Sequence, residues 1–481
     1  MITTQQLYQL YLQHPVISTD TRKIATGSLF FALKGDKFDA NTFAQQAIAA
    51  GAAYAVIDNP AYQLGDEYLL VADVLTALQD LARHHRRQLT IPVIGLTGTN
   101  GKTTTKELIN AVLSQHFKTQ ATQGNLNNHI GVPLSILTID ASHQMAVIEM
   151  GANHQKEIEL LCTIAQPSHG LITNVGKAHL EGFGGVEGVK KGKGELYDYF
   201  AKSGSPEVRK SESPEDRKSG SLIGQQVANA VFINSDDQTL LDMAAARKLG
   251  NVVYYGTNTI DDLVSGELVE NSPLLALEYT NNKTGQSYTV KTQLTGAYNL
   301  HNILAAIAIG SYFNIPAAQI NAGIEGYQPK NNRSQIVKTE SNTLICDYYN
   351  ANPSSMFVAI ENMDKLQAPR KVLILGDMFE MGPESAAEHA SVIQKALDTP
   401  VDERIFIGKD FESQNSKLRS TLEHLEETTP SEKLKIQNRE AVFYATAEDA
   451  IAALKASPIT HSTILIKGSR GMALERLVEL F

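Results

Sequence analysis

Short apolar runs alternate with amphipathic stretches along most of this chain, a pattern typical of strands alternating with helices. Near the N-terminus, segments 28–35 (SLFFALKG) and 54–58 (YAVID) have the character of strands. Between them, 41–52 (NTFAQQAIAAGA) has the character of a helix closed by a glycine. Residues 1–88 are therefore predicted to form a small α/β domain.

A second domain is expected after the basic stretch 83–87. Segment 91–97 (IPVIGLT) is a buried strand that leads through a glycine-rich turn into a helical pattern, KTTTKELINAVLSQHF. Further strands are predicted at 145–150 (MAVIEM), 169–175 (HGLITNV) and 230–234 (AVFIN), each followed by a helix-like or glycine-rich segment. This rhythm predicts a central, doubly wound domain with a parallel sheet over 89–328.

The alternation starts again near residue 329. Helical segments such as PSSMFVAIENM and AEDAIAALKA separate four predicted strands, TLICDYY, KVLILGDM, RIFIGKD and TILIKGS. This pattern predicts a Rossmann-like third domain over 329–481. Proline and paired asparagines at 329–332 suit a hinge between domains that close on a substrate. The expected fold class is thus α/β with three domains.

One segment interrupts the central pattern. SPEVRKS at 205–211 nearly repeats as SPEDRKS at 213–219, within a stretch rich in serine, proline and alternating charge. Such composition is typical of a solvated loop. We expect a flexible surface insert over about 203–222 and assign it no chemistry.

Composition and charge narrow the classes of protein that fit. A chain of 481 residues is too long for one core, since cores stop growing at roughly 250 to 300 residues. The net charge of −10 argues against general affinity for nucleic acid or anionic membrane. The two cysteines, Cys162 and Cys346, are too few for a disulfide framework and indicate buried thiols in a reducing compartment. Without a secretory leader or a long apolar run, the chain is expected in the cytoplasm, with no membrane insertion.

The clearest chemical motif is GLTGTNGKTT at 95–104. It resembles a Walker A loop, although Leu96 takes the place of the first glycine. Glycines let backbone N–H groups turn toward phosphate oxygens, Lys102 adds a positive charge, and Thr103 offers a hydroxyl to magnesium at a helix N-terminus. With a strand before it and a helix after it, the loop predicts nucleotide binding rather than an ordinary glycine-rich turn.

Three other side chains are candidates near that loop. Glu149 ends a predicted strand, at the sheet edge where open α/β folds place their sites, and a carboxylate suits magnesium. His179 and Lys193 follow in NVGKAHLEG and KKGKGE. Taken alone, a single histidine is more often a hydrogen-bonded structural residue than a ligand, and a run of lysines is more often a solvated surface.

Seven ordered motifs resemble those of the Mur ligases over nearly the whole chain: TGTNGKTTTKE, GNLNNHIGVPLSIL, VIEMGANHQKEIELL, ITNVGKAHLEGFG, DYYNANPSSM, LGDMFEMG and IKGSRGMALE. The resemblance implies an N-terminal UDP-sugar-binding domain, a central ATPase and a C-terminal ligase domain that closes over the nucleotide. It implies an ADP-forming ligase of peptidoglycan synthesis. Such an enzyme phosphorylates the terminal carboxylate of UDP-N-acetylmuramoyl-tripeptide and joins the resulting acyl phosphate to D-alanyl-D-alanine.

The resemblance also implies roles for the residues that match the family's motifs. Catalysis would fall to Lys102, His179 and Lys193, the last being the lysine that the family carbamylates with carbon dioxide. Magnesium, expected at two sites, would be bound by Thr103, Glu149, His179 and the carbamate of Lys193. ATP would contact Gly98, Thr99, Asn100, Gly101, Lys102, Thr103, Thr104, Asn299, Asn302, Arg333, Asp347 and Tyr349.

Two further sets belong to the other substrates. The UDP-sugar-peptide would contact Ser18, Asp20, Arg22, Lys34, Gly35, Asp36, Phe38, Asn125, Asn128 and His129. The dipeptide would contact Asn350, Asn352, Lys467, Ser469 and Arg470. The chain is expected to act as a monomer.

The chain departs from the family pattern in three places. Lys177 stands where the family usually has an acid, Tyr298 replaces a common histidine, and the repeat insert is extra. None of these changes removes an expected ligand, but Lys177 brings a positive charge toward the metal pocket.

Three alternatives are weighed against this interpretation. Two share the P-loop and the lysine chemistry: a sister ligase that adds the third amino acid, and a folylpolyglutamate synthetase, which lacks the N-terminal unit. DYYNANP at 347–353 favours the dipeptide-adding branch, because the diaminopimelate-adding ligase carries a D-N-P-R type motif instead. The third is a non-catalytic ATP-binding switch, which the complete ligand set disfavours.

Overall fold

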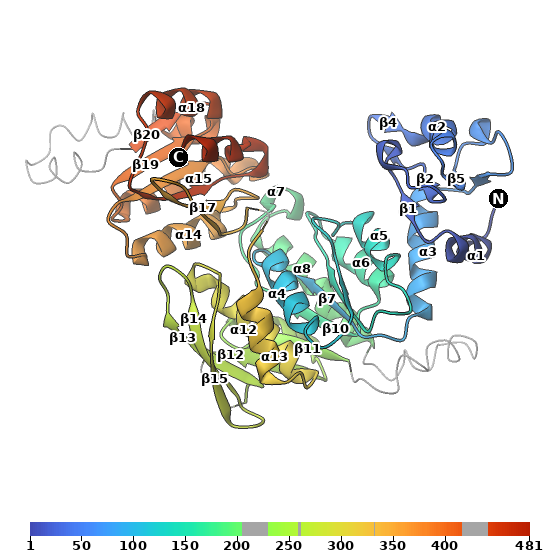
Figure 1. Ribbon diagram of the computed structural model, residues 1–481, viewed down its shortest axis with the longest axis horizontal. Coiled ribbons are helices and arrows are strands. Elements are labelled where there is room, and N and C mark those ends of the chain that lie inside the picture. The colour runs from blue at the N-terminus through green and yellow to red at the C-terminus, as the bar shows by residue number, and fades with distance from the viewer. Residues whose placement is uncertain (204–228, 258–260, 331, 416–440) are drawn as a thin grey trace, which may run out of the picture.

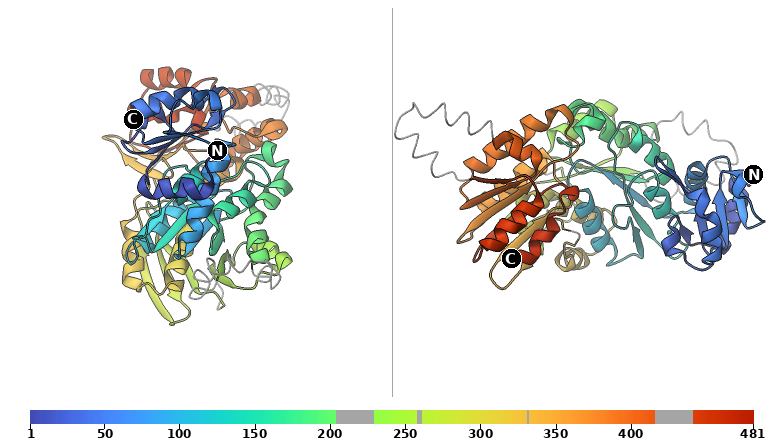
Figure 2. Two further views of the ribbon diagram at one scale, coloured as in Figure 1. Left: turned by 90° about the vertical axis from the view of Figure 1, so that its right-hand side faces the viewer. Right: turned by 90° about the horizontal axis from the view of Figure 1, so that it is seen from above.

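The computed structural model of the chain describes residues 1–203, 229–257, 261–330, 332–415 and 441–481. Most of the predicted insert at 203–222 therefore lies outside the described residues, as does position 331 in the predicted hinge. Three lobes are visible, with the N-terminal and third domains at opposite ends of the long axis and the central domain between them (Figures 1 and 2). The predicted three-domain α/β architecture is confirmed.

The N-terminal domain is built on a four-stranded parallel sheet in the order β1-β2-β5-β6. A short antiparallel hairpin, β3–β4, projects beside it. The elements are α1 (Thr4–Gln13), β1 (Ile17–Ser18), β2 (Leu29–Phe31), β3 (Lys34–Gly35), β4 (Phe38–Asp39), α2 (Ala44–Ala49), β5 (Tyr54–Ile57), β6 (Tyr68–Leu70) and α3 (Val74–Gln88).

Helix α3 joins this domain to the next one. Its Arg86 side chain is 1% exposed, and the guanidinium donates hydrogen bonds to the carbonyl oxygens of Ala165 (2.9 Å) and Gln166 (3.0 Å) in the central domain. Gln79 on the same helix donates to the carbonyl of His129 at 3.0 Å. Because a buried guanidinium needs partners for its N–H groups, these bonds fix the helix against the central domain.

The central domain contains a nine-stranded sheet in the order β15-β14-β13-β12-β11-β10-β7-β9-β8. Strands β7 to β13 pair in parallel, whereas β13–β14 and β14–β15 are antiparallel. The strands are β7 (Val93–Thr97), β8 (Thr119–Ala121), β9 (Met145–Glu149), β10 (His169–Ile172), β11 (Ala230–Asn234), β12 (Val252–Gly256), β13 (Val264–Glu270), β14 (Ala276–Asn281) and β15 (Gln286–Lys291). The prediction of a parallel sheet is thus correct for the site-bearing strands and wrong at one edge.

Helices cover both faces of this sheet, which confirms the doubly wound prediction (Figure 1). Neighbouring residues of β7 point into different cores: Val93 packs with α3, α5, α6 and α8, and Ile94 packs with α4, α12 and α13. The helices are α4 (Lys102–Leu113), α5 (Gly131–Ile136), α6 (Glu157–Ala165), α7 (Leu180–Phe183), α8 (Val186–Ser203), α11 (Gln238–Arg247), α12 (Leu300–Tyr312) and α13 (Ala317–Gly326).

The third domain is Rossmann-like, as predicted, with a six-stranded sheet in the order β16-β17-β21-β18-β19-β20. Its pairings are parallel except at the β16 edge, which is antiparallel to β17. The elements are β16 (Gln335–Lys338), β17 (Thr343–Asp347), α14 (Pro353–Lys365), β18 (Lys371–Gly376), α15 (Ser385–Asp398), β19 (Glu403–Ile407), β20 (Ala441–Tyr444), α18 (Ala447–Ala456) and β21 (Thr463–Lys467).

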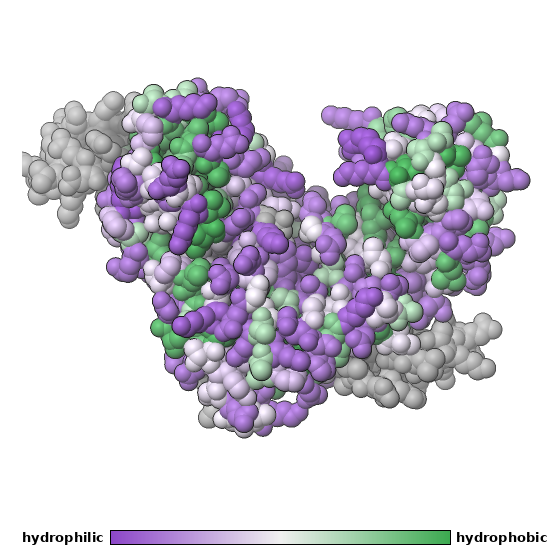
Figure 3. All heavy atoms as spheres, in the orientation of Figure 1, coloured by the Kyte–Doolittle hydropathy of each residue, from purple (hydrophilic) through white to green (hydrophobic). Residues whose placement is uncertain are grey.

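Short 3-10 helices punctuate the loops of all three domains. They are η1 (Thr21–Lys23), η2 (Ala40–Phe43), η3 (Pro60–Tyr62), η4 (Ala297–Asn299), η5 (Gly382–Glu384), η7 (Arg470–Met472) and η8 (Leu474–Leu480). Among the described helices, none combines the length and the apolar character needed to cross a bilayer. The surface is hollowed by a broad notch between the two end domains (Figure 3).

Candidate active site

The glycine-rich loop between β7 and α4 has the predicted strand–turn–helix geometry. Gly101 has a φ of +78°, in the left-handed region, and a Cβ there would lie 2.7 Å from Asn302 Oδ1. Gly98, with a φ of +148°, approaches Thr173 so closely that a Cβ would lie 2.0 Å from its Oγ1. Both positions therefore require glycine, and α4 begins directly afterwards at Lys102.

Lys102 folds back over this loop. Its Nζ donates to the carbonyl oxygens of Gly98 (2.8 Å) and Thr99 (2.9 Å). Burial is the main reason that the pKa of Lys102 is lowered to about 8; the charge of Glu149 opposes this shift, and the charge of Arg333 contributes to it. Two cations in a desolvated site attract an anion more strongly than they would in water.

A segment after β10 holds the loop in place. The backbone N–H of Asn100 donates to the side-chain oxygen of Asn174 at 3.0 Å, and the Asn174 amide donates back to the Asn100 carbonyl at 3.0 Å. Gly176 N–H donates to Thr99 Oγ1 at 2.9 Å. Asn174 was absent from the predicted site residues, although it stands in the ITNVGKAH motif and could have been found there.

Glu149, which was predicted to bind magnesium, is held in a buried position at the sheet edge. It ends β9, is 1% exposed, and receives a hydrogen bond from Asn127 Nδ2 on Oε1 at 2.8 Å. Its Oε2 is buried and has no hydrogen-bond partner among the residues that the structure describes. A buried carboxylate oxygen left in this state fits a cation. Asn127 lies between the predicted residues Asn125 and Asn128 of the same motif, but its contact with Glu149 was not predicted.

His179 lies at the seam between two domains. It has a φ of +51°, and its Nδ1 contacts Glu380 Oε2 in the third domain. Burial lowers the pKa of His179, and Glu380 opposes that shift. A third-domain carboxylate thus contacts the histidine that was expected to bind magnesium.

Lys193 on α8 is almost fully enclosed. The side chain is 2% exposed, and its Nζ donates to the carbonyl oxygen of Ala152 at 3.0 Å and lies 4.9 Å from the centre of the Phe183 ring. Burial holds the pKa of Lys193 well below its usual range, and the charge of Lys102 lowers it further. The neutral amine is therefore favoured, which is the form that reacts with carbon dioxide.

The described residues contain no group of three or more His, Cys, Asp or Glu side chains arranged to hold a metal. Of the expected magnesium ligands, two belong to these residue types, Glu149 and His179. A third, Thr103, is buried at the start of α4. A carbamate on Lys193 would add the missing acidic oxygen atoms.

The two asparagines expected beside adenine belong to one hydrogen-bond chain at the start of α12. Asn302 donates to Asn299 Oδ1 at 2.9 Å and accepts from Thr105 at 3.0 Å. Asn299 in turn donates to the carbonyl of Thr295 at 2.8 Å. Tyr298, which replaces a common histidine, contacts Ser334 through its hydroxyl and so joins the central domain to the third.

Third-domain residues approach the loop from the other side. Asp347 accepts from Lys467 Nζ at 2.6 Å, so two predicted site residues form an ion pair with each other. Asn352 caps α14 through its side-chain oxygen, and its amide donates to Asn100 Oδ1 at 2.8 Å. Asn352 therefore connects the proposed dipeptide region directly to the phosphate loop.

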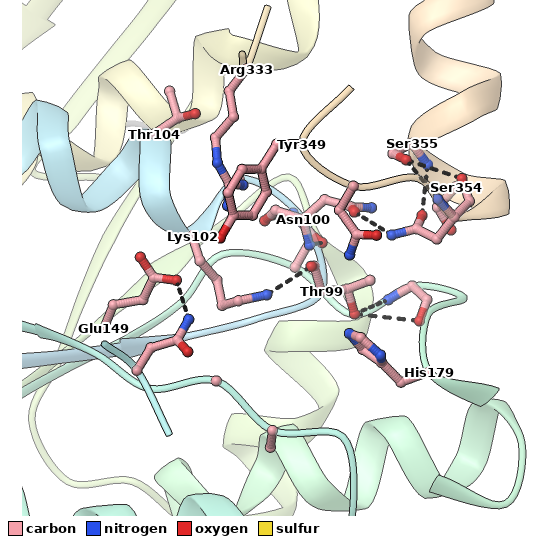
Figure 4. A pocket seen from close by; sticks show the side chains of 18 of the residues that line it. Thr99, Asn100, Lys102, Thr104, Glu149, His179, Arg333, Tyr349, Ser354 and Ser355 are labelled. Carbon is pink, nitrogen blue, oxygen red and sulfur yellow. Dashed lines mark hydrogen bonds between the residues drawn. The ribbon is translucent and has the colours of Figure 1, made fainter. Parts of the chain in front are cut away.

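These groups meet in one cavity of about 870 Å³ between the central and third domains (Figure 4). The predicted residues that line it are Thr99, Asn100, Gly101, Lys102, Thr104, Asn125, Asn128, His129, Glu149, His179, Asn299, Asn302, Arg333, Asp347, Tyr349, Asn350, Asn352 and Lys467. Five other residues predicted for catalysis, magnesium, ATP or the dipeptide are not among those that line it: Gly98, Thr103, Lys193, Ser469 and Arg470. Of these, Arg470 reaches Tyr349, with its Cζ 5.3 Å from the ring centre.

The predicted UDP-sugar residues of the N-terminal domain lie outside this cavity: Ser18, Asp20, Arg22, Lys34, Gly35, Asp36 and Phe38. Asp20 and Arg22 form an ion pair at 2.8 Å, and Lys34 pairs with Asp58 at 2.8 Å. Phe38 is exposed on the β3–β4 hairpin. Their role in binding the UDP-sugar stays a prediction.

Comparison with known proteins covers all three domains. Models of the Mur ligase family match residues 15–86 (catalytic domain), 96–211 and 217–310 (middle domain) and 332–470 (glutamate ligase domain). The chain is 32% identical over 476 residues to the UDP-N-acetylmuramoyl-tripeptide–D-alanyl-D-alanine ligase of Bacillus subtilis, covering 96% of this chain and 92% of that protein. It is 34% identical to the Escherichia coli protein of the same name, with coverage of 96% and 92%.

Solved structures agree in fold. The crystal structure of MurF from Acinetobacter baumannii superposes with a TM-score of 0.79 at 28% identity, covering 99% of this chain and 98% of that one. MurF ligase from Thermotoga maritima in complex with ADP gives a TM-score of 0.75 at 22% identity, with coverage of 97% and 96%.

Proposed function

This chain belongs to the Mur ligase family, and from that premise we propose that it is an ATP-dependent, ADP-forming ligase that adds D-alanyl-D-alanine to UDP-N-acetylmuramoyl-tripeptide. The relatives named above carry that activity in their names and share more than nine-tenths of their length with the chain. The reaction would serve the synthesis of peptidoglycan precursors.

One observation carries the proposal: the phosphate loop and the DYYNANP segment line the same cavity. Lys102 of the loop and Asn350 and Asn352 of that segment all face it. A nucleotide and an incoming amine can therefore be held together in one cavity. Such proximity is what a two-step transfer through an unstable intermediate requires.

The chemistry follows from the substrates. A carboxylate resists attack by an amine until one of its oxygens becomes a leaving group. We propose that the tripeptide carboxylate attacks the γ-phosphorus of ATP, with ADP leaving, and that the dipeptide amine then attacks the acyl carbon and expels phosphate. Lys102 and Arg333 offset the negative charge of the phosphates in the desolvated cavity.

Magnesium fits the residues at the loop. Thr103, Glu149 and His179 would bind it, directly or through water, and bound magnesium would neutralise the charge that develops on the transferred phosphate. The unpartnered Oε2 of Glu149 supports this assignment.

We further infer that Lys193 is carbamylated. The favoured neutral amine can add to carbon dioxide, forming a C–N bond and releasing a proton, and the product is an anionic oxygen ligand. Lys193 is enclosed, and among the described residues its Nζ donates to a carbonyl oxygen and to no acidic side chain, which supports this role. Free buried thiols at Cys162 and Cys346 are consistent with a reducing compartment, and the reaction is proposed to be cytoplasmic.

Phosphate release from ATP tests the proposal. It is measured with UDP-muramoyl-tripeptide and either D-Ala-D-Ala or single amino acids as second substrate. Turnover confined to the dipeptide is expected. Turnover with a single amino acid would instead indicate a sister ligase, and nucleotide binding without turnover in any combination would indicate an ATP-binding switch.

A further inference from the structure

Lys177 and Glu388 form an ion pair that spans two domains. Lys177 lies in the segment between β10 and α7 of the central domain, and Glu388 lies in the first turn of α15 in the third domain. The distance from Lys177 Nζ to Glu388 Oε1 is 2.6 Å. The charge that the sequence placed toward the metal pocket is thus directed at the third domain instead.

The pair can form only while the two domains are in contact. The Glu388 side chain is 11% exposed and that of Lys177 49%. If the third domain moved away, the carboxylate would lose its cation and return to water. Attraction between a half-exposed pair is modest, but two like charges at this distance would oppose contact.

The same segment is connected to the phosphate loop. Gly176, the neighbour of Lys177, donates its N–H to Thr99 Oγ1 at 2.9 Å. The N–H of Lys177 donates to Ser354 Oγ, at the start of α14, at 2.9 Å. A Cβ at position 176 would lie 2.9 Å from that same Oγ, so the glycine permits the close approach of α14. Residues 176 and 177 therefore contact both the loop and the third domain.

We propose that the Lys177–Glu388 pair is an interdomain latch that couples nucleotide binding at the phosphate loop to closure of the third domain. These are positioning residues, and the inference rests on the proposed function because it takes the cavity as the ATP site. Arg333 and Tyr349 line that cavity beside the loop, so a nucleotide binds more tightly when they are in place. An acid at position 177 would repel Glu388.

Charge reversal tests the latch in the full chain. ADP binding with magnesium is measured by calorimetry, and the radius of gyration by small-angle scattering with and without ADP. Lys177→Glu and Glu388→Lys should each weaken ADP binding roughly tenfold and reduce the compaction on adding ADP. The double exchange should restore both quantities to within about twofold of the unmodified chain.

A matched control lies inside the third domain. Lys395 on α15 pairs with Glu361 on α14 at 3.0 Å, so Lys395→Glu reverses a charge on the same helix without crossing the seam. It should leave ADP affinity unchanged. If a reversed variant does not fold, Lys177→Gln and Glu388→Gln address the same question. Each is expected to lower the affinity for ADP roughly threefold.

The latch is overturned if the single variants bind ADP normally, or if the double exchange binds as weakly as they do. Failure of the unmodified chain to bind ADP would instead overturn the proposed function. The two failures are therefore distinguishable in one set of measurements.

Discussion

The guanidinium of Arg333 stacks on the ring of Tyr349, with its Cζ 3.8 Å from the ring centre. Arg333 follows the interdomain connection and Tyr349 follows β17, and both lie over Lys102 (Figure 4). Because a stacked guanidinium is held in one plane, its N–H groups keep a fixed direction. The stack thus presents a positioned cation to the phosphate loop.

Removing the ring should release that cation. Tyr349→Ala is expected to raise the KM for ATP roughly tenfold, whereas Tyr349→Phe, which keeps the stacking surface, should stay within about twofold. Steady-state phosphate release at varied ATP concentration measures both. Equal defects in the two variants would show that the hydroxyl matters and that the stack does not.

Lys193→Ala should abolish ligation because it removes the amine that would carry the carbamate. Added short carboxylic acids should restore part of the activity, since they can supply the lost oxygen ligand. Lys191→Ala, at an exposed position of the same helix, is the matched control and should be fully active. Full activity of Lys193→Ala without added acid would contradict the carbamate role.

Glu149→Gln should keep the hydrogen bond from Asn127, because the amide oxygen can still accept it, while losing the negative charge. The magnesium concentration needed for half-maximal ADP binding is expected to rise by about tenfold or more. Glu159 lies on α6 with a partly exposed side chain, and Glu159→Gln serves as the control. An unchanged magnesium requirement in Glu149→Gln would place the metal elsewhere.

His169 should make the central domain sensitive to acid. Burial among aromatic rings lowers the pKa of His169 to about 4, from 6.5. Since the unfolded chain takes up this proton at higher pH than the folded one, the stabilisation is complete above pH 6.5 and is lost as the pH falls toward 4. Lowering the pH from 7 to 5 should therefore reduce the free energy of unfolding by about 2 kcal/mol through this group.

The comparison for His169 uses urea unfolding followed by circular dichroism at both pH values. His169→Phe should lose about 2 kcal/mol less than the unmodified chain over that interval, whatever its stability at pH 7. An identical loss in both proteins would assign the acid sensitivity to other groups.

The site-bearing strands were predictable because they are buried on both faces and read as continuous apolar runs, as in VIGLT of β7. The antiparallel strands at 264–291 were not predicted, because polar residues alternate with apolar ones along them and Gly266 lowers the strand propensity. That glycine is needed because a Cβ would lie 2.8 Å from Leu304. Only tertiary packing reveals this requirement.

Candidate site residues divide in the same way. The loop residues from Thr99 to Lys102 could be predicted because each has a chemical reason within one short motif. The hydrogen bond from Asn127 to Glu149 could not be predicted, and neither could the contact of the Lys177 side chain with the third domain. Both depend on partners distant in sequence. A short motif indicates the chemistry that a residue can supply, whereas the partner that its side chain contacts depends on the tertiary fold.

The buried Arg86 has a practical consequence for dissecting the protein into fragments. A truncation that starts the chain at residue 89 would delete the guanidinium that satisfies two central-domain carbonyls and would uncover the apolar surface beneath α3. Ending a fragment before Val74 would instead strip the N-terminal domain of the helix on which α1 packs. The first two domains should therefore be expressed, crystallised and unfolded as one piece.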